Sequence, residues 1–335
     1  MTVDCNLSME KSVTLKEIQE ARQRILNVSY RTPLYRCPRL SALAGAEVYL
    51  KLESFQPTRV FKIRGASNKI LKLSPDERKR GFVAASSGNH GLAVSYVAAM
   101  VSAKATIIVP TTAVEEKVLA IEEYGGQVIK HGLFHDERMS KAIEVQKATN
   151  AIFVPPFDDP DIIAGQGTIG LEIIEDLPHV DTVIVPIGGG GLISGISIAI
   201  KALKPGTRMV GVEPAKASSM YESIRAGRIT RLTDTRTIAD GLATREPGSL
   251  TFAIAKSNVD EILLVTEEEI RKAVYTVFQE CHLVVEPSAA AAVAALSKWK
   301  PLKTKEQVAV VISGGNISTK LLSETLLRYG QNPTE

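Results

Sequence analysis

The sequence is poor in cysteine, in aromatic side chains and in long apolar runs. Its 335 residues include three cysteines and 5% aromatic residues. Cys5, Cys37 and Cys281 are odd in number, far apart and without a CxxC spacing, which argues against a disulfide framework and against a zinc site. No apolar stretch reaches the length that a membrane-spanning helix requires. We therefore expect a protein of the reducing cytoplasm, with no bound metal and no membrane contact.

The charge shows no strong excess of either sign. The net charge of +3 arises from 40 basic and 37 acidic residues that are scattered along the chain. Proteins that bind nucleic acids usually carry a basic patch or stripe, so we expect no nucleic-acid partner. The polar run around Asp4, Glu10 and Lys11 lacks the charged-then-apolar order of a signal peptide.

Short apolar runs alternate with helix-like segments over most of the chain. The predicted strands of a first block are 82–85, 105–109, 127–130 and 152–155, and those of a second block are 182–186, 209–213, 262–265 and 308–312. Such apolar runs are typical of strands that are buried on both faces of a parallel sheet. The pattern predicts an α/β protein with two doubly wound, mostly parallel sheets. We assign residues 1–74 and 156–335 to a large domain and residues 75–155 to a small one, with a cleft between them.

A lysine, Lys62, lies in the stretch Gln56–Ala66, which directly follows a predicted strand at 46–52. We expect Lys62 at or just inside the start of a helix that runs to Leu71. A lysine in this context is often a surface side chain with its stem on apolar surface. Three glycine-rich turns elsewhere in the chain make it a candidate nucleophile.

Three glycine-rich turns each follow a predicted strand and precede a predicted helix: Ser86–Gly91, Gly188–Gly191 and Ser313–Asn316. Free amides at a helix N-terminus bind anions, and glycine lets the backbone approach a phosphate. Simpler explanations exist, since four glycines can form a flexible turn, and Ser or Asn can cap a helix. The turn at 188–191 is neither GxxxxGK[ST] nor GxGxxG, so a nucleoside triphosphate or a dinucleotide is poorly supported. A lysine beside several amide cradles suits a cofactor with a carbonyl and a phosphate.

The motifs, taken in order, resemble those of the fold-type II pyridoxal-phosphate enzymes, in the branch of the serine/threonine dehydratases and serine racemases. The likeness runs from Arg31-Thr32-Pro33-Leu34 to the last helix. It includes Lys51-Leu52-Glu53, Phe61-Lys62-Ile63-Arg64-Gly65-Ala66, Ile163-Ala164-Gly165-Gln166-Gly167-Thr168, Gly211-Val212-Glu213-Pro214, Ala239-Asp240-Gly241 and Glu286-Pro287-Ser288, together with the three turns. The resemblance implies a tryptophan-synthase-β-like fold with the cofactor, pyridoxal 5'-phosphate, in the cleft between the domains. It also implies a homo-oligomer.

The resemblance also implies roles for individual residues. Lys62 is the Schiff-base lysine and catalytic base, and Ser87 matches the opposite-face base of serine racemase, although a helix-capping serine explains it equally well. The other implied cofactor contacts are Phe61, Asn89, Gly188, Gly189, Gly190, Gly191, Gly241, Glu286 and Ser313. The implied substrate contacts are Ser86, Ser87, Asn89 and His90.

These residues imply a dehydratase or ammonia-lyase that removes the β-hydroxyl of L-threonine, L-serine or a related amino acid, giving a 2-oxo acid and ammonia. A serine at position 313, in place of an acid, weakens the electron sink and favours elimination. The alternative is an amino-acid racemase that uses Lys62 and Ser87 on opposite faces. Two departures favour the lyase, because Phe157 stands where animal serine racemases carry asparagine, and Ser219 replaces one carboxylate of the racemase metal site beside Glu213 and Ala217.

A third hypothesis is a catalytically idle protein that binds the cofactor or senses a ligand. The chain retains each residue that the chemistry needs, which argues against this hypothesis. The substrate side chain stays open, including substrates with a second carboxylate.

Overall fold

The computed structural model describes residues 13–86, 88–113, 115–133 and 135–330. The larger of its two sheets has the strand order β1 (Leu34–Arg36), β2 (Glu47–Leu52), β10 (Gln307–Ile312), β7 (Thr182–Pro186), β8 (Arg208–Pro214), β9 (Glu261–Val265). The edge strand β1 is antiparallel to β2, and the other neighbours in this sheet are parallel. The strands predicted in the second block are therefore neighbours in one sheet.

The smaller sheet contains the strands that were predicted in the first block. Its order is β5 (Gly126–Lys130), β4 (Ala105–Val109), β3 (Phe82–Ala85), β6 (Ile152–Phe153), and all its neighbours are parallel. The strand β6 is shorter than the predicted 152–155, because pairing with β3 ends at Phe153. The two mostly parallel sheets confirm the predicted fold class.

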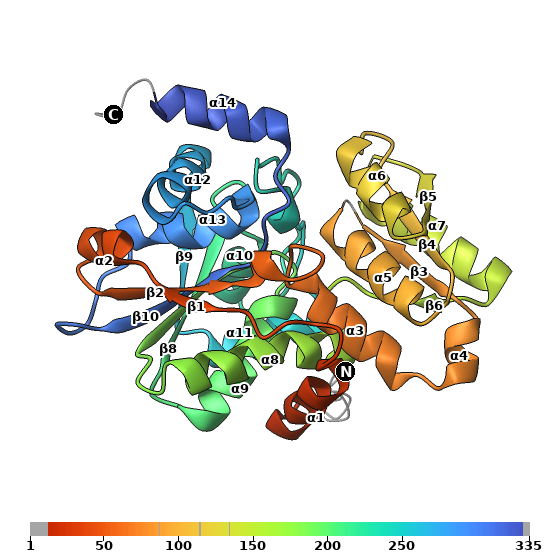
Figure 1. Ribbon diagram of the computed structural model, residues 1–335, viewed down its shortest axis with the longest axis horizontal. Coiled ribbons are helices and arrows are strands. Elements are labelled where there is room, and N and C mark those ends of the chain that lie inside the picture. Colours follow the sequence, from red (N-terminus) through yellow and green to blue (C-terminus); the bar gives the residue numbers. More distant parts are fainter. Residues whose placement is uncertain (1–12, 87, 114, 134, 331–335) are drawn as a thin grey trace.

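Helices cover both faces of the large sheet (Figure 1). On one face lie α1 (Leu15–Ile25), α8 (Pro160–Asp176), α9 (Gly191–Leu203) and α11 (Ser249–Asn258). On the other lie α2 (Pro38–Ala44), α12 (Glu267–Cys281), α13 (Pro287–Ala294) and η4 (Ala295–Ser297), with α14 (Thr319–Gly330) packed outside α12. The helix α10 (Ser219–Ala226) follows β8. The short turn η2 (Glu53–Phe55) follows β2, and the short turn η3 (Asp240–Leu242) precedes α11.

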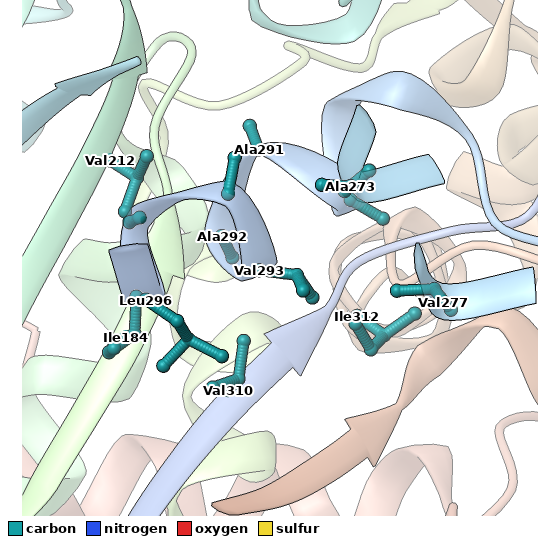
Figure 2. Close-up of a cluster of buried hydrophobic side chains, with 14 of the residues drawn as sticks. Ile184, Val212, Ala273, Val277, Ala291, Ala292, Val293, Leu296, Val310 and Ile312 are labelled. Atoms are coloured by element: carbon teal, nitrogen blue, oxygen red, sulfur yellow. The ribbon is translucent and has the colours of Figure 1, made fainter. Parts of the chain in front are cut away.

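The alanine-rich helix α13 forms the centre of the larger core. Figure 2 shows Val293 of α13 beside Val310 and Ile312 of β10, and Ala291 and Ala292 belong to the same cluster. Small side chains let this helix approach the sheet closely, and its residues 289–292 are fully buried. The N-terminus of α13 is thereby fixed directly after Glu286, which is one of the predicted site residues.

The smaller sheet is also covered on both faces. Side chains at alternate positions of β3 point to opposite faces, so Phe82 and Ala84 contact α5 (Asn89–Met100), while Val83 and Ala85 contact α7 (His135–Thr149). The helix α6 (Glu115–Glu123) lies on the same face as α5. Both helices that follow the Ser86 turn therefore belong to one layer, and α5 begins at Asn89, within that turn.

The helix α3 (Lys62–Lys72) packs between the two layers, followed by the short α4 (Pro75–Lys79). Its apolar residues Ile63, Ala66 and Ile70 join the core of the small sheet. On its other side, Gly65 lies against α8, where a Cβ would come within 2.4 Å of the Gln166 amide nitrogen. All strands of the small sheet lie within the segment 75–155, and α3 contacts both parts, so the proposed boundary at residue 74 stays a prediction.

Four charged side chains from β2, η2, α3 and α8 form a buried cluster under α3. Arg64 Nε donates to Glu53 Oε2 at 2.7 Å, and Arg64 Nη1 donates to Glu172 Oε1 at 2.6 Å. Lys51 Nζ lies 2.6 Å from Glu172 Oε2. The Lys51-Leu52-Glu53 motif and the arginine beside the candidate lysine thus form a salt-bridge network in the interior. Among the described residues, no helix is long and apolar enough to cross a membrane.

Candidate active site

The predicted site residues converge on two adjoining cavities between the sheets. The larger has a volume of about 820 Å³, and Lys62, Ser86, Asn89 and His90 line it. The smaller has about 60 Å³, and its lining includes Phe61, Lys62, Asn89, Gly188, Gly189, Gly190, Gly191, Gly241, Glu286 and Ser313. Lys62 and Asn89 line both cavities, so these side chains lie where the two spaces meet.

Lys62 is the first residue of α3, and its amine is buried in this site. Its Nζ donates to the carbonyl oxygen of Pro156 at 2.5 Å and lies 5.2 Å from the centre of the Phe61 ring. Burial lowers the pKa of Lys62 from 10.5 to about 8, and the charge of Glu286 partly opposes this shift. A lysine with such a pKa is neutral in about a tenth of the molecules at pH 7, far more than an ordinary lysine, so its nitrogen can act as nucleophile or base.

The four glycines at 188–191 lead from β7 into α9. Gly190, the N-cap of α9, has a φ of +93°, which favours glycine over residues with a side chain. A Cβ on Gly189 would lie 2.3 Å from the Phe157 ring, and one on Gly188 would lie 2.9 Å from the Gly241 carbonyl oxygen. The first amides of a helix lack carbonyl partners within that helix. The turn therefore combines a tightly packed backbone with anion-binding amides.

The Ser86 turn holds its own hydroxyl in a defined position. Ser86 Oγ accepts hydrogen bonds from the N–H of Gly88 at 3.1 Å and of Gly91 at 2.9 Å. A hydroxyl has two lone pairs and one hydrogen, so these contacts leave the Ser86 O–H to donate. That hydrogen suits an anionic group such as a carboxylate. Ser87, the predicted second base, lies outside the described residues.

His90 is buried and anchored beside the larger cavity. Its Nε2 lies 2.9 Å from the carbonyl oxygen of Val154, which requires a hydrogen on Nε2. Burial and the charge of Lys62 lower the pKa of His90 to about 3. The ring is therefore neutral at physiological pH, and its buried Nδ1, which has no partner among the described residues, is an acceptor.

Asn89 connects the small sheet with the large one. Its Nδ2 lies 2.9 Å from both carboxylate oxygens of Glu286, and its Oδ1 accepts from Asn316 Nδ2 at 2.9 Å. Burial, aided by the charge of Asp240, raises the pKa of Glu286 to about 7. The amide of Asn89 is thus held in one orientation by the third predicted turn and by the N-terminus of α13.

Ser313 lies directly after β10 at the base of the smaller cavity. Its side chain is buried, and its carbonyl accepts from the N–H of Phe61 at 3.0 Å. This contact joins the third turn to the residue before Lys62. The position therefore offers a hydroxyl to a group in the cavity.

The structure also identifies contacts in the site that the sequence did not predict. Lys117 of α6 forms an ion pair with Asp240 of η3, and both line the larger cavity. Pro156 holds the amine of Lys62 through its carbonyl, and Phe157 covers the glycine turn. No local motif marks Lys117, because its role depends on a residue more than a hundred positions away.

The residues compared with a racemase metal site are arranged around a buried carboxylate. Glu213 accepts from the N–H of Met220 at 2.9 Å and of Tyr221 at 2.8 Å. Burial raises the pKa of Glu213 to about 8. In the part of the chain that the structure describes, no three His, Cys, Asp or Glu side chains gather to hold a metal ion.

Comparisons with known proteins place this site in a family. Residues 25–314 match the pyridoxal-phosphate-dependent enzymes. L-threonine ammonia-lyase of Thermotoga maritima is 46% identical over 94% of this chain and 78% of its own length. The catabolic L-threonine dehydratase of Escherichia coli K12 is 41% identical over 95% of this chain and 98% of its own length. Both relatives carry the predicted type of activity in their names.

Solved structures agree with these sequence relatives. Maize serine racemase superposes with a TM-score of 0.90 at 34% identity, over 96% of this chain and 99% of that one. The processed form of threonine deaminase isoform 2 from Solanum lycopersicum superposes with a TM-score of 0.86 at 34% identity, over 94% of each chain. The relatives thus include racemases as well as lyases, and their balance confirms the predicted lyase class.

The chemistry of the site fits pyridoxal phosphate. The carbonyl of this cofactor reacts with a neutral amine, which Lys62 supplies. Its phosphate needs amide donors, which the turn at 188–191 supplies. Motifs, fold, cavity and relatives agree on one assignment, and the chain belongs to the family of pyridoxal-phosphate-dependent enzymes.

Proposed function

We propose that this protein is an ammonia-lyase that converts L-threonine, and also L-serine, into a 2-oxo acid and ammonia. The observation that carries the proposal is the buried amine of Lys62, whose pKa is about 8, at the junction of the two cavities. The 46% identity to an L-threonine ammonia-lyase supports the choice of substrate.

The cofactor would occupy the smaller cavity. We assign its phosphate to Gly188–Gly191, its ring nitrogen to the hydroxyl of Ser313 and its ring face to Phe61. The amide of Asn89 would meet its phenolic oxygen, while Gly241 and Glu286 line the remaining wall. When bound, pyridoxal phosphate acts as an electron sink that makes the Cα proton of an amino acid acidic.

The substrate would occupy the larger cavity beside the cofactor. The Ser86 hydroxyl, whose lone pairs are already used by Gly88 and Gly91, donates to the substrate carboxylate. We assign Ser87, Asn89 and His90 to the same binding loop. Because the pKa of His90 is lowered to about 3, its neutral ring is too weak a base to compete with Lys62 for the proton.

Lys62 takes the Cα proton at Nζ. The β-hydroxyl takes up one proton, which balances the proton lost from Cα, and leaves as water. The unsaturated product gains a proton at Cβ as its nitrogen loses one, and water then hydrolyses the C=N bond to release ammonia and the 2-oxo acid. The neutral amine needed for this step is available because burial disfavours the charged form. The Pro156 carbonyl orients that amine toward the cavity junction.

The decisive experiment incubates the holoenzyme with L-threonine and with L-serine and measures 2-oxo acid and D-amino acid together. We expect 2-oxo acid without D-amino acid. Racemic product without net elimination would refute the lyase proposal. The matched variant Lys62→Ala should lose both the activity and the visible absorption band of the bound cofactor.

A racemase is the second candidate, and a specific observation favours it. Serine racemase of Dictyostelium discoideum is 40% identical over 94% of this chain, close to the value for the dehydratases. Racemisation would need Ser87 as the opposite-face base. Replacing Ser87 with Ala should leave 2-oxo acid formation largely intact if elimination is the physiological reaction.

We further propose a cytoplasmic homo-oligomer. The described cysteines are free thiols, which fits a reducing compartment. The resemblance to a family of dimers and tetramers supports self-association. Light scattering on the purified protein at working concentration tests the oligomer, and a monomer mass would contradict it.

A further inference from the structure

The turn that we assign to the cofactor phosphate is held from outside by the helix α11. Thr251 of this helix is fully buried, and its Oγ1 donates to the carbonyl oxygen of Gly189 at 2.7 Å. A Cβ on the next residue, Gly190, would lie 2.9 Å from Thr251 Cβ. The hydroxyl and the body of one threonine therefore contact two consecutive residues of the turn.

This contact fixes the direction of one peptide group. In a trans peptide, the C=O and the N–H point to opposite sides of the chain, and the described residues contain no cis peptide. Because the Gly189 carbonyl points to Thr251, the N–H of Gly190 points away from α11. A peptide between two glycines rotates easily, so without this partner it could adopt the opposite orientation.

The helix that carries Thr251 lacks a cap of its own. Its N-cap is Gly248, which has no side chain to accept the first amides. Asp158 supplies this function from 93 residues earlier in the chain. Its Oδ2 accepts from Ser249 N at 3.0 Å, and its Oδ1 accepts from the N–H of Leu250 at 3.0 Å and of Thr251 at 3.1 Å. A Cβ on Gly248 would lie 2.1 Å from Asp158 Cγ, so the glycine is needed for this approach.

Asp158 belongs to the segment that also contacts Lys62 and the turn. The carbonyl of Pro156 accepts from Lys62 Nζ, and the ring of Phe157 lies against Gly189. Three consecutive residues thus connect the amine, the glycine turn and the N-terminus of α11. The position of the turn relative to Lys62 is set through this segment.

We propose that Thr251 and Asp158 are positioning residues for the cofactor phosphate: Thr251 locks the Gly189–Gly190 peptide, and Asp158 holds the helix that carries Thr251. This inference rests on the placement of the phosphate in the proposed function. It adds that the helix α11, capped by Asp158, supports the glycine turn from outside; we call this helix and its cap the brace.

The test is the dissociation constant of pyridoxal phosphate, measured by titrating the apoenzyme of each variant. Thr251→Val keeps the shape but removes the hydroxyl, and we expect it to weaken binding about tenfold or more, the effect of losing one buried hydrogen bond. Thr251→Ser restores the hydroxyl and should bind within about threefold of the unsubstituted protein. The phosphorus NMR signal of the bound cofactor should shift in Thr251→Val and return in Thr251→Ser.

Asp158→Ala should weaken cofactor binding in the same way, and Asp158→Asn, which keeps one acceptor, should weaken it less. Because both residues act on one turn, their effects should not be independent. The dissociation constant of the double variant Asp158→Ala/Thr251→Val should rise by less than the product of the two single-variant increases. Independent losses would overturn the claim that the two residues form one brace.

The matched control is Thr266→Val, which removes the cap of α12 in the same domain. It should lower the unfolding temperature and leave the dissociation constant unchanged. If Thr251→Val behaves like this control, Thr251 is merely structural and the inference is wrong. A protein that binds the cofactor normally but does not turn over threonine would refute only the activity, and one that binds no cofactor would refute both proposals.

A separate observation concerns two of the three cysteines. Cys37, at the N-cap of α2, and Cys281, the last residue of α12, are buried with their sulfur atoms 2.9 Å apart. They are 244 positions apart in sequence, which is why spacing alone did not pair them. The two side chains already face each other across the contact of the two helices.

We infer that Cys37 and Cys281 form a disulfide under oxidising conditions. With hydrogen peroxide as oxidant, the two thiols lose two electrons and two protons, the sulfur atoms bond, and the peroxide becomes two molecules of water. Burial raises the pKa of the Cys281 thiol, so the reaction is slow compared with that of an exposed thiol. Closing so long a loop restricts the unfolded chain and should raise the unfolding temperature by several degrees.

Peptide mass spectrometry after peroxide treatment tests this inference in a Cys5→Ser background. We expect a cross-linked Cys37–Cys281 peptide that is two hydrogens lighter than the sum of the free peptides, together with a higher unfolding temperature. The variant Cys281→Ser should show neither change. Oxidised methionines without this cross-link would show that peroxide acted and that the inference is wrong.

Discussion

Two cations in the first turn of α3, the buried Arg64 and the half-buried Lys62, have opposite electrostatic environments. Arg64 contacts the carboxylates of Glu53 and Glu172, which keep it charged. Lys62 contacts the neutral carbonyl of Pro156, and the nearest carboxylate that raises its pKa is the more distant Glu286. The effect of burial therefore outweighs that of Glu286, and the pKa of Lys62 falls to about 8. The partner set, rather than burial alone, separates the reactive cation from the structural one.

The rate at which the apoenzyme takes up pyridoxal phosphate should depend on the neutral fraction of Lys62. Below a pKa of about 8 that fraction falls tenfold per pH unit, so the rate should rise with pH and level off above about 8. Stopped-flow absorbance of the visible cofactor band measures this rate. A midpoint near 10.5, the ordinary lysine value, would show that the amine is solvated.

Replacing Arg64 with Met should destabilise the fold by about 3–5 kcal/mol, because two buried carboxylates lose their shared partner. Urea unfolding, followed by circular dichroism, measures the loss. The exposed pair of Lys79 and Asp76 offers the control, and Lys79→Ala should leave the unfolding midpoint unchanged. Equal effects of the two substitutions would contradict the role of the buried network.

At the scale of elements, the turn between β7 and α9 shows why glycine is needed at particular positions. Gly190 has the left-handed φ of +93°, while Gly188 and Gly189 are constrained by the close approach of Gly241 and Phe157. The sequence predicted the turn and its place at a helix start. It could not show that neighbours from four other segments pack against its outer side.

Gly190→Ala should weaken cofactor binding and destabilise the protein by about 1–3 kcal/mol, since its Cβ meets Met220 and Thr251 in a strained conformation. Cofactor titration and thermal unfolding give the two values. Gly206, where a Cβ would meet nothing within 4 Å, is the control, and Gly206→Ala should leave both values almost unchanged. Normal binding by Gly190→Ala would mean that the turn tolerates a side chain.

At the scale of the whole molecule, ion pairs join the two sheet layers across the mouth of the larger cavity. Lys117 of α6 pairs with Asp240 of η3, and Asp136 of α7 pairs with Arg231, which lies between α10 and η3. The stem of Lys117 also lies beside Gly88 of the Ser86 turn. The loop that we assign to the substrate carboxylate is therefore tied to the larger layer at the cavity mouth.

Lys117→Met keeps the apolar stem and removes the charge, so it should loosen this tie. We expect KM for L-threonine to rise several-fold while kcat stays within about twofold, because binding is affected more than the chemical step. Steady-state kinetics separate the two constants. Arg236→Met, which breaks a local pair with Asp234 at the same cavity, should change neither constant.

The sequence alone predicted the strands other than the short edge strand β1, together with the glycine-rich turns and their order, because apolar runs and turn residues are local signals. It placed Lys62 at a helix start, which the structure confirms, and it predicted the family and its cofactor, which the comparisons confirm. The site residues were found by motif rather than by contact. Their roles stay predictions.

Only the tertiary structure decided which residues act on one another across the chain. The lowered pKa of Lys62 depends on its burial and on its distance from Glu286, which lies far along the same chain. The cap that Asp158 gives to α11 and the meeting of Cys37 with Cys281 also arise from folding. Contacts between residues so far apart leave no periodic signal, so they follow from packing and not from local sequence.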